Sequence, residues 1–419
     1  MMSPASNTAP RMNRTICLSF CQAQYEDIIQ SPQKFRQEID KAIEKHPELF
    51  PLEITSGYKM KEIRLSKKLN LKTRRIITSG TSYSIRPSFA LPYMTGFTQD
   101  AEGPLFLRKF AVPFWAPAHC FGKNAMYWYR LESSLGRNSV LGTTIKSANL
   151  LPQHLSADEK HTRILGNKTY IATTAGSGCI LGAAVSESAS REKLEDAYGI
   201  FKEEAECINP EYRPDTVNTD GWLPTQSAWK ALFPQVMVLA CFLHIFISIR
   251  DRSRKKYKEL FGEVATKLWD CFKAESKASF SQRVRRLSEW CLDTKREVPA
   301  VISDKIKKLK DNLPQFSRAY DFPGAHRTTN MVDRLMQRMD RHLFSTQYFH
   351  GTLKSANLSI RAWVLIQNFA PLNPWTVKRK RHMSSFERVN GFQYHENWLQ
   401  NLLISASLGG YRNGPPNTL

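Results

Sequence analysis

Residues 155–185 read LSADEKHTRILGNKTYIATTAGSGCILGAAV, and they hold three short runs of β-prone residues, at 157–164, 168–174 and 179–185. Gly166 and Asn167 separate the first two runs, and the small residues 175–178 separate the second pair. Short linkers that contain glycine between β-prone runs are typical of hairpins. This stretch therefore predicts a three-stranded antiparallel meander.

The segments after the meander alternate between helical and strand patterns. Apolar residues at helical spacing follow a capping serine, Ser188 or Ser190, and apolar runs bounded by turn residues read as strands. The pattern predicts a helix, a strand, a helix and a buried strand that runs into a further helix, at 190–207, 215–219, 225–232 and 236–243. The order βββαβαβ, with the later strands parallel to the first, is that of the ribonuclease H-like fold. We therefore expect an α/β fold with such a mixed sheet, whose first part covers 151–249.

Two regions precede the meander. Residues 1–30 are expected to be disordered or poorly ordered, and 31–150 to form a DNA-binding region. In the latter, two helical patterns meet at Gly122, which predicts a helix-turn-helix at about 114–136. An ordinary αα-hairpin with a glycine turn has the same pattern. If the second helix enters the major groove, the candidate DNA contacts are Lys123, Asn124, Tyr127, Arg130 and, after the helix, Arg137.

The second half of the chain is predicted to be helical. Residues 250–325 are highly charged and predict an all-α insertion, and 326–350 return to the core with a helix over 328–344. Residues 351–419 predict a C-terminal helical region with an amphipathic helix over 398–408.

The charge is strongly basic, with 60 Lys and Arg against 38 Asp and Glu, a formal net charge of +22. Nucleic acid is the commonest partner of such a surface, because phosphate contacts release counterions. Residues 59–75 are a basic strand pair or a solvated basic face, and 378–381 are a nuclear signal or, as we prefer, a phosphate clamp.

Compartment and metal chemistry are constrained by what the sequence contains. The eight cysteines form no pair of C-x-x-C motifs, which argues against a zinc ribbon. The start lacks an apolar core of signal length, and the most apolar stretch, 236–249, is too short to span a bilayer. We expect no membrane association and a cytoplasmic, nucleoid-associated location in a prokaryote.

Three acidic residues fall where such a sheet places metal ligands. Asp158 lies on the first predicted strand, Asp220 where the fourth strand ends, and Asp333 near the start of the helix after the last strand. Phosphodiester chemistry commonly uses two Mg²⁺ ions about 4 Å apart, held by a few carboxylates. The sequence therefore predicts a two-Mg²⁺ site, with Mn²⁺ able to substitute. Two of these aspartates also have simpler interpretations. Asp158 could be a surface strand residue beside an equally exposed Glu159, and Asp220 could be a turn residue before Gly221.

The same stretches resemble DDE/DDD transposases, in particular Mutator-like and related bacterial insertion-sequence transposases. The resemblance rests on ADEKH at 157–161, NTDGW at 218–222, CFLH at 241–244 and TNMVDR at 329–334, under half of the chain. It implies that Asp158, Asp220 and Asp333 are catalytic. It also implies that the C-x-x-H pair on the last strand, Cys241 and His244, supports the site, as does Asn330. The third carboxylate of the family is normally glutamate, so Glu387 competes with Asp333.

The expected function is that of a DNA transposase. The implied partners are double-stranded DNA, as the terminal repeats of a mobile element and as target, and a second copy of the chain in a homodimer or higher oligomer. Two alternatives stay open at this point: a ribonuclease H-like nuclease or resolvase without strand transfer, and a DNA-binding relative without catalysis.

Overall fold

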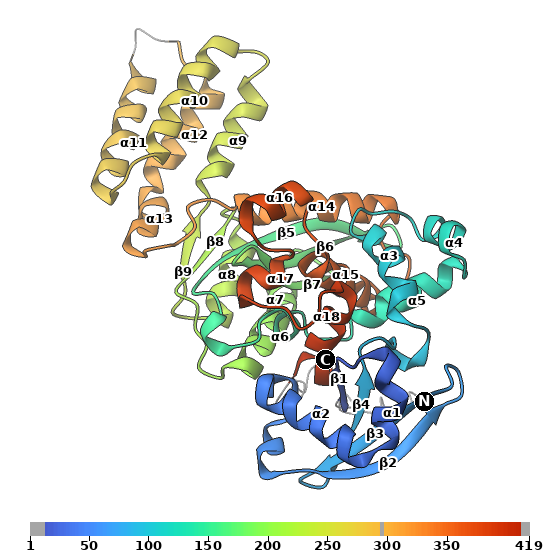
Figure 1. Ribbon diagram of the computed structural model, residues 1–419. Helices are drawn as coiled ribbons and strands as arrows, with labels where there is room; N and C mark the ends of the chain where they lie inside the picture. The colour runs from blue at the N-terminus through green and yellow to red at the C-terminus, as the bar shows by residue number, and fades with distance from the viewer. Residues whose placement is uncertain (1–12, 294–296, 412–419) are drawn as a thin grey trace, which may run out of the picture.

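The computed structural model describes residues 13–293 and 297–411, which form a mixed α/β structure with 56% helix and 17% strand. Figure 1 shows three parts: an N-terminal sheet at the bottom, a central body, and a helical bundle that projects at the upper left. Among the described residues, none of the helices is both long and apolar enough to cross a membrane.

The N-terminal part is a four-stranded sheet in the order β1-β4-β3-β2, with β1 parallel to β4 and the other pairs antiparallel. Phe35 and Ile39 bury one face of a helix in its core. Its elements are β1 (Thr15–Leu18), α1 (Tyr25–Gln30), α2 (Pro32–Lys45), β2 (Lys59–Ser66), β3 (Leu71–Thr78) and β4 (Thr81–Pro87). The basic stretch is therefore the hairpin of β2 and β3.

The predicted disorder over 1–30 was wrong for the residues that the structure describes. From Asn13 onward this range holds β1 and α1, and the Cys17 backbone N donates to Ser407 Oγ at 2.9 Å. The strand is thus held by the far end of the chain, a contact that local composition does not reveal. Residues 1–12 lie outside the described residues.

Short helices connect the N-terminal sheet to the central body. The two helices predicted around Gly122 are present: α4 ends at Gly122, which has φ 72°, and Asn124 caps α5 by accepting a hydrogen bond from Tyr127 N. The connecting helices are α3 (Thr98–Arg108), α4 (Trp115–Phe121), α5 (Ala125–Leu135) and α6 (Val140–Thr144).

The central body is built on a five-stranded sheet in the order β7-β6-β5-β8-β9. The first three strands form the predicted antiparallel meander, and β8 and β9 run parallel to β5. The strands are β5 (His154–Ile164), β6 (Asn167–Gly176), β7 (Cys179–Ser186), β8 (Thr216–Thr219) and β9 (Met237–Ala240).

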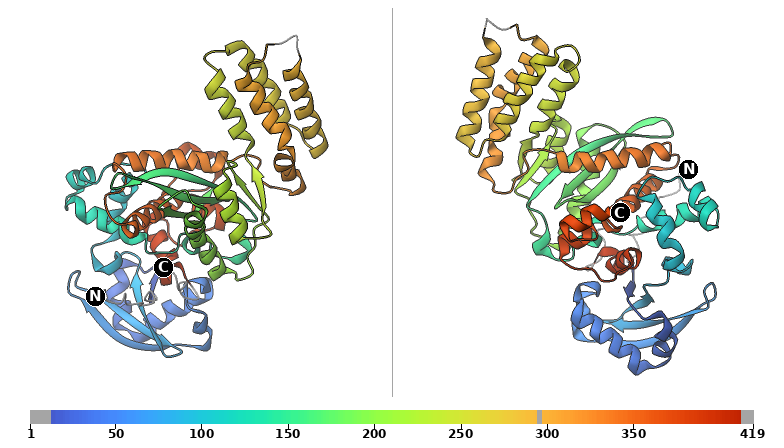
Figure 2. Two further views of the ribbon diagram at one scale, coloured as in Figure 1. Left: turned by 180° about the vertical axis from the view of Figure 1, so that it is seen from behind. Right: turned by 45° about the horizontal axis from the view of Figure 1, so that its top comes forward.

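Helices cover both faces of this sheet (Figure 2). On one face, α7 (Arg191–Ile208) and α8 (Leu223–Leu232) bury Tyr198, Phe201 and Trp229 in a common core. On the other, α14 (Asn330–Ser345) contacts β5 and β6, and α15 (Leu353–Phe369) contacts β7. The sheet is therefore a central layer between two layers of helices.

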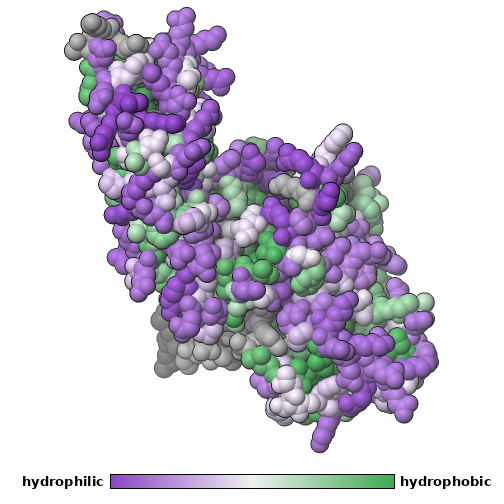
Figure 3. All heavy atoms as spheres, turned by 60° about the vertical axis from the view of Figure 1, so that its left-hand side comes forward, coloured by the Kyte–Doolittle hydropathy of each residue, from purple (hydrophilic) through white to green (hydrophobic). Residues whose placement is uncertain are grey.

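The helical insertion is confirmed, but it begins earlier than predicted. The expected strand over 236–243 ends at Ala240, Cys241 is the N-cap of the next helix, and His244 lies in that helix's first turn. The C-x-x-H pair therefore does not lie on the last strand. The bundle has its own apolar core, and its surface is mostly hydrophilic (Figure 3). Its helices are α9 (Phe242–Ser253), α10 (Lys258–Phe272), α11 (Lys277–Leu292), α12 (Ala300–Asp311) and α13 (Leu313–Ser317).

The C-terminal helices return to the centre of the molecule. They are α16 (Pro374–Lys380), α17 (Ser385–Asn390) and α18 (Trp398–Ser405), which follow the almost wholly buried end of α15. The prediction of an amphipathic helix at 398–408 was wrong, because α18 is buried nearly all round and packs against β1 and α3.

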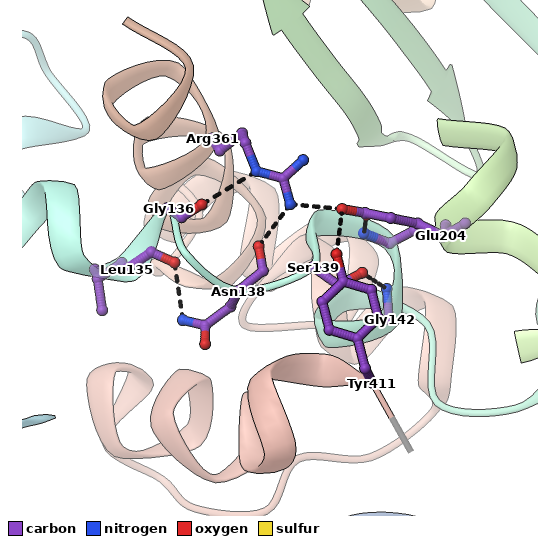
Figure 4. Close-up of polar contacts among 9 residues, drawn as sticks. Leu135, Gly136, Asn138, Ser139, Gly142, Glu204, Arg361 and Tyr411 are labelled. Carbon is purple, nitrogen blue, oxygen red and sulfur yellow. Dashed lines mark hydrogen bonds and ion pairs between the residues drawn. The ribbon is translucent and has the colours of Figure 1, made fainter. Parts of the chain in front are cut away.

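A buried ion pair joins three of these regions (Figure 4). Arg361 Nη2 on α15 lies 2.5 Å from Glu204 Oε1 on α7, and Tyr411 Oη donates to the same oxygen at 3.2 Å. The guanidinium also donates to the carbonyl oxygens of Gly136 and Asn138 in the connection after α5. Every charged group here has partners, as buried charges require.

Candidate active site

Asp158 lies on β5, and Asp220 directly follows the end of the neighbouring strand β8. Ser156 of β5 is in parallel register with Asn218 of β8, so Asp158 and Asp220, each two residues further on, reach the same level. Side chains alternate along a strand, so Asp158 lies on the same face as Ser156. Asp220 is exposed just beyond β8, where its Oδ1 accepts from the Trp222 backbone N at 2.7 Å. Adjacent strands are about 4.8 Å apart. The chain therefore brings two carboxylates from distant points of the sequence to one spot.

Asp333 enters this spot from the first turn of α14. Thr329, the N-cap residue of α14, donates from its hydroxyl to both carboxylate oxygens of Asp333, at 3.2 and 3.1 Å. The same hydroxyl lies 3.1 Å from Cys241 Sγ and 3.5 Å from His244 Nδ1, and the Thr329 backbone N donates to Cys241 Sγ at 3.2 Å. Thr329 thus joins the start of α9 to the start of α14.

The C-x-x-H pair acts through this connection. Cys241 and His244 come one helical turn apart at the start of α9, so both side chains point at the same neighbour. Sequence reasoning selected the pair and Asp333 but did not single out Thr329. The available signal was its place four residues before Asp333, one turn away on the same helical face.

These groups lie in one electrostatic environment. Burial and the nearby carboxylates of Asp220 and Asp333 together raise the pKa of Asp158 to about 7, against the lowering effect of His244. Burial also raises the pKa of Asp333, while His244 and the Thr329 hydroxyl lower it. Burial lowers the pKa of His244, but its hydrogen bond to Cys241 and the two carboxylates outweigh burial and bring it to about 9. A protonated His244 therefore offsets the mutual repulsion of the aspartates.

Glu159 is not the exposed neighbour that the sequence suggested. Its side chain lies on the opposite face of the sheet, where Glu159 Oε1 accepts from Tyr198 Oη at 2.6 Å and from Thr225 Oγ1 at 2.5 Å. Burial raises its pKa to about 7, against those two hydrogen bonds. Glu159 thus ties β5 to α7 and α8 from behind Asp158.

The donor set suits a hard divalent cation that keeps water and substrate ligands. In the described part of the chain, no Lys or Arg forms an ion pair with Asp158, Asp220 or Asp333. Two buried polar atoms of the same face, Ser156 Oγ and Asn218 Oδ1, have no hydrogen-bond partner. Among these residues, no three His, Cys, Asp or Glu side chains lie together in a way that could hold a metal ion. The oxygen ligands that the three aspartates offer are nevertheless of the type that Mg²⁺ prefers, because Mg²⁺ binds through few carboxylates and retains several waters.

The other candidates of the site lie apart from this cluster. Glu387 Oε2 accepts from the Met383 backbone N, and Ser384 caps the same short helix, so the Glu387 carboxylate serves its own helix end. Asn330 is the first residue of α14 and is exposed, one position after the N-cap. Asp333 is therefore the carboxylate that the fold brings toward Asp158.

The predicted DNA contacts fall on one side of α5. Arg130 and Arg137 are exposed, and Arg137 Nη1 donates to Tyr93 Oη at 2.6 Å. Asn124 caps the helix, and the Lys123 ammonium lies 6.0 Å from the centre of the Tyr127 ring. These side chains share one surface, although that surface faces the loop before α3.

No protein-family model matches the chain, and no curated protein is similar to it.

Proposed function

We propose that this protein is a DNA transposase with a ribonuclease H-like catalytic core, in which Asp158, Asp220 and Asp333 hold two Mg²⁺ ions. One observation carries the proposal: the carboxylates of Asp220, directly after β8, and of Asp333, in the first turn of α14, lie close enough to Asp158 on β5 to raise its pKa. The strand order β7-β6-β5-β8-β9 with this meander supports the same assignment.

The bound ions would supply activation of the attacking hydroxyl and charge neutralisation at phosphorus. The chain's own residues would position the metal ligands and balance their charge. Asp158 presents its carboxylate from β5, Asp220 presents its carboxylate from the turn after β8, and Thr329 orients Asp333 through its hydroxyl. His244 holds a proton next to the cluster and balances part of its negative charge.

The proposed reaction has two steps, hydrolysis and strand transfer. Water first adds to a phosphodiester at the element's end, the P–O3′ bond breaks, and a free 3′-hydroxyl and a 5′-phosphate result. That 3′-hydroxyl then attacks a target phosphodiester, a new P–O3′ bond forms, and the target strand leaves with its own 3′-hydroxyl. Neither step involves oxidation or a covalent bond between protein and DNA.

Other parts of the chain have matching roles in this proposal. The net charge of +22 favours DNA as the partner, and the basic residues 378–381 suit a phosphate clamp. The projecting bundle of α9 to α13 would contact flanking DNA or a second protomer, because pairing two element ends requires at least two copies of the chain.

The test uses aspartate-to-asparagine variants, which keep shape and remove charge. We expect Asp158→Asn and Asp220→Asn to abolish Mg²⁺-dependent cleavage of DNA carrying the element's ends, with DNA binding retained. Asp340→Asn is the matched control, because Asp340 lies on α14 and pairs with Lys160 at 2.5 Å outside the cluster. Cleavage unchanged in both site variants would overturn the proposal.

A second assay separates transposition from simple cleavage. A pre-cut DNA end with a free 3′-hydroxyl should be joined to a plasmid target by the wild-type protein and not by Asp158→Asn. Cleavage without joining would instead assign a nuclease or resolvase, and neither activity would assign a DNA-binding relative.

A further inference from the structure

Two hollows away from the aspartates share lining residues. The first lies between the loop of Tyr93, α5 and α15, and the second between the N-terminal sheet, the same loop and the end of α5. The first has a volume of about 670 Å³ and the second about 580 Å³. Tyr93 and Arg137 line both, so this pair stands between them. We call the two hollows together the groove, which Tyr93 and Arg137 divide.

The charged side chains that line this groove are all basic. Arg130 lines the first hollow, Arg14 and Arg86 line the second, and Arg137 lines both. Among the described residues, neither hollow is lined by an aspartate or a glutamate. A groove with several guanidinium groups and no carboxylate is complementary to a chain of phosphates.

The groove also offers aromatic rings. Tyr93 is 64% exposed, and Tyr127 and Tyr129 line the first hollow with it. The Arg137 guanidinium carbon lies 5.3 Å from the centre of the Tyr93 ring, and Nη1 donates to its hydroxyl. Arginine beside an exposed ring is the combination with which proteins bind unpaired bases.

The loop that presents Tyr93 is held in a strained shape. Tyr93 and Met94 have φ of 59° and 51°, in the left-handed region that residues other than glycine seldom adopt. Hydrogen bonds of Leu91 N to Gly96 O and of Tyr127 Oη to Thr95 O hold this loop against α5. Strain of this kind persists where the surrounding structure imposes it, often at binding sites.

This loop changes the expected use of α5. Its Tyr127 side is covered by the loop, and its far end packs on α15, where Gly136 approaches Leu358 closely. The helix is thus flanked on two sides, unlike a recognition helix that must enter a 12 Å major groove. Exposed polar residues of α5 instead line the first hollow.

We propose that the groove divided by Tyr93 and Arg137 binds an unpaired single strand of DNA. Bases would stack on Tyr93, and phosphates would contact Arg137 and the arginines on either side. The proposal rests on the proposed function only for the choice of DNA, and it does not involve the aspartates.

The test measures binding without catalysis. The full-length protein in EDTA is titrated into fluorescent single-stranded 12-mers, the matching duplex, RNA of the same sequence, and the mononucleotide. We expect the DNA single strand to bind most tightly. Tyr93→Gly, which suits the positive φ and removes the ring, should weaken this binding by about tenfold, the loss of one stacked base.

Charge and position are tested by separate measurements. Arg137→Gln should lower the slope of log affinity against log salt by about 0.7, the value for one phosphate contact on a single strand. Arg191→Gln is the control, because Arg191 is a charged residue of α7 outside the groove, where it pairs with Glu195 at 3.7 Å. In the wild-type protein, an oligonucleotide carrying 5-iododeoxyuridine should crosslink under light to Tyr93.

Several results would overturn this inference. They are unchanged single-strand affinity in both groove variants, equal loss of duplex and single-strand binding in Tyr93→Gly, preference for RNA, and mononucleotide binding as tight as that of the 12-mer. Because all these measurements omit Mg²⁺, they are independent of whether the aspartates catalyse cleavage.

Discussion

Removing the buried carboxylate of Glu204 should strongly destabilise the central body. Glu204 is 1% exposed, and its carboxylate accepts from Arg361, from Tyr411 and, through Oε2, from Leu141 N at 2.8 Å (Figure 4). In Glu204→Leu the Arg361 guanidinium keeps its two carbonyl partners but loses its carboxylate partner. Leaving a buried charge uncompensated costs about 3–5 kcal/mol.

The assay is thermal unfolding of the single variants and of the double variant. At about 2–4 °C per kcal/mol, Glu204→Leu should lower the Tm of this part by roughly 6–20 °C. Glu204→Leu combined with Arg361→Met should recover most of that loss, because no unpaired charge stays buried. A single variant within about 1 °C of wild type, or a double variant less stable than both singles, would refute this reasoning, since surface substitutions change stability by only about 0.5 kcal/mol.

Three further outcomes follow from individual contacts. Burial holds the pKa of His342 well below 6.5, so its contribution to stability is present above pH 6.5 and is lost as pH falls below it; His342→Phe should flatten the pH dependence of urea unfolding there by up to about 1.4 kcal/mol per pH unit. Thr329→Val removes the hydroxyl bonded to Asp333, and we expect a higher Mg²⁺ concentration for half-maximal cleavage while circular dichroism stays unchanged. In Gly136→Ala the new Cβ would lie 1.9 Å from Leu358 O, so this variant should fold with a lower Tm or be insoluble, whereas Gly262→Ala in open space should behave as wild type in the same expression trial.

Local pattern was sufficient for most of the secondary structure. The meander and α7 with its serine cap lie where periodicity and turn residues place them, and the charged helical insertion is present but begins at Phe242, earlier than its charge pattern indicates. The errors occurred where tertiary contacts override local pattern. β1 is ordered because it pairs with β4 and meets Ser407, and α18 is buried all round because other elements cover its polar side.

The candidate site could likewise be predicted from the sequence only in part. Asp158, Asp220 and Asp333 were selected from the sequence because each follows a recognisable strand or helix signal. Their proximity depends on the parallel register of β5 with β8, which no local pattern specifies. The roles of Thr329 and Glu159 depend on contacts with other elements. Thr329 contacts the start of α9, and Glu159 contacts α7 and α8.

The sequence by itself determined the basic charge, the alternation of strands and helices, and the residue types able to bind a metal ion. Those properties depend on composition and on contacts within a few residues. The tertiary structure alone decided that the carboxylates of Asp220 and Asp333 lie close enough to raise the pKa of Asp158, that Cys241 and His244 meet Thr329, and that Arg137 bonds to Tyr93. Each of these depends on packing between segments distant in the chain, where burial and steric fit, rather than local preference, select the partner.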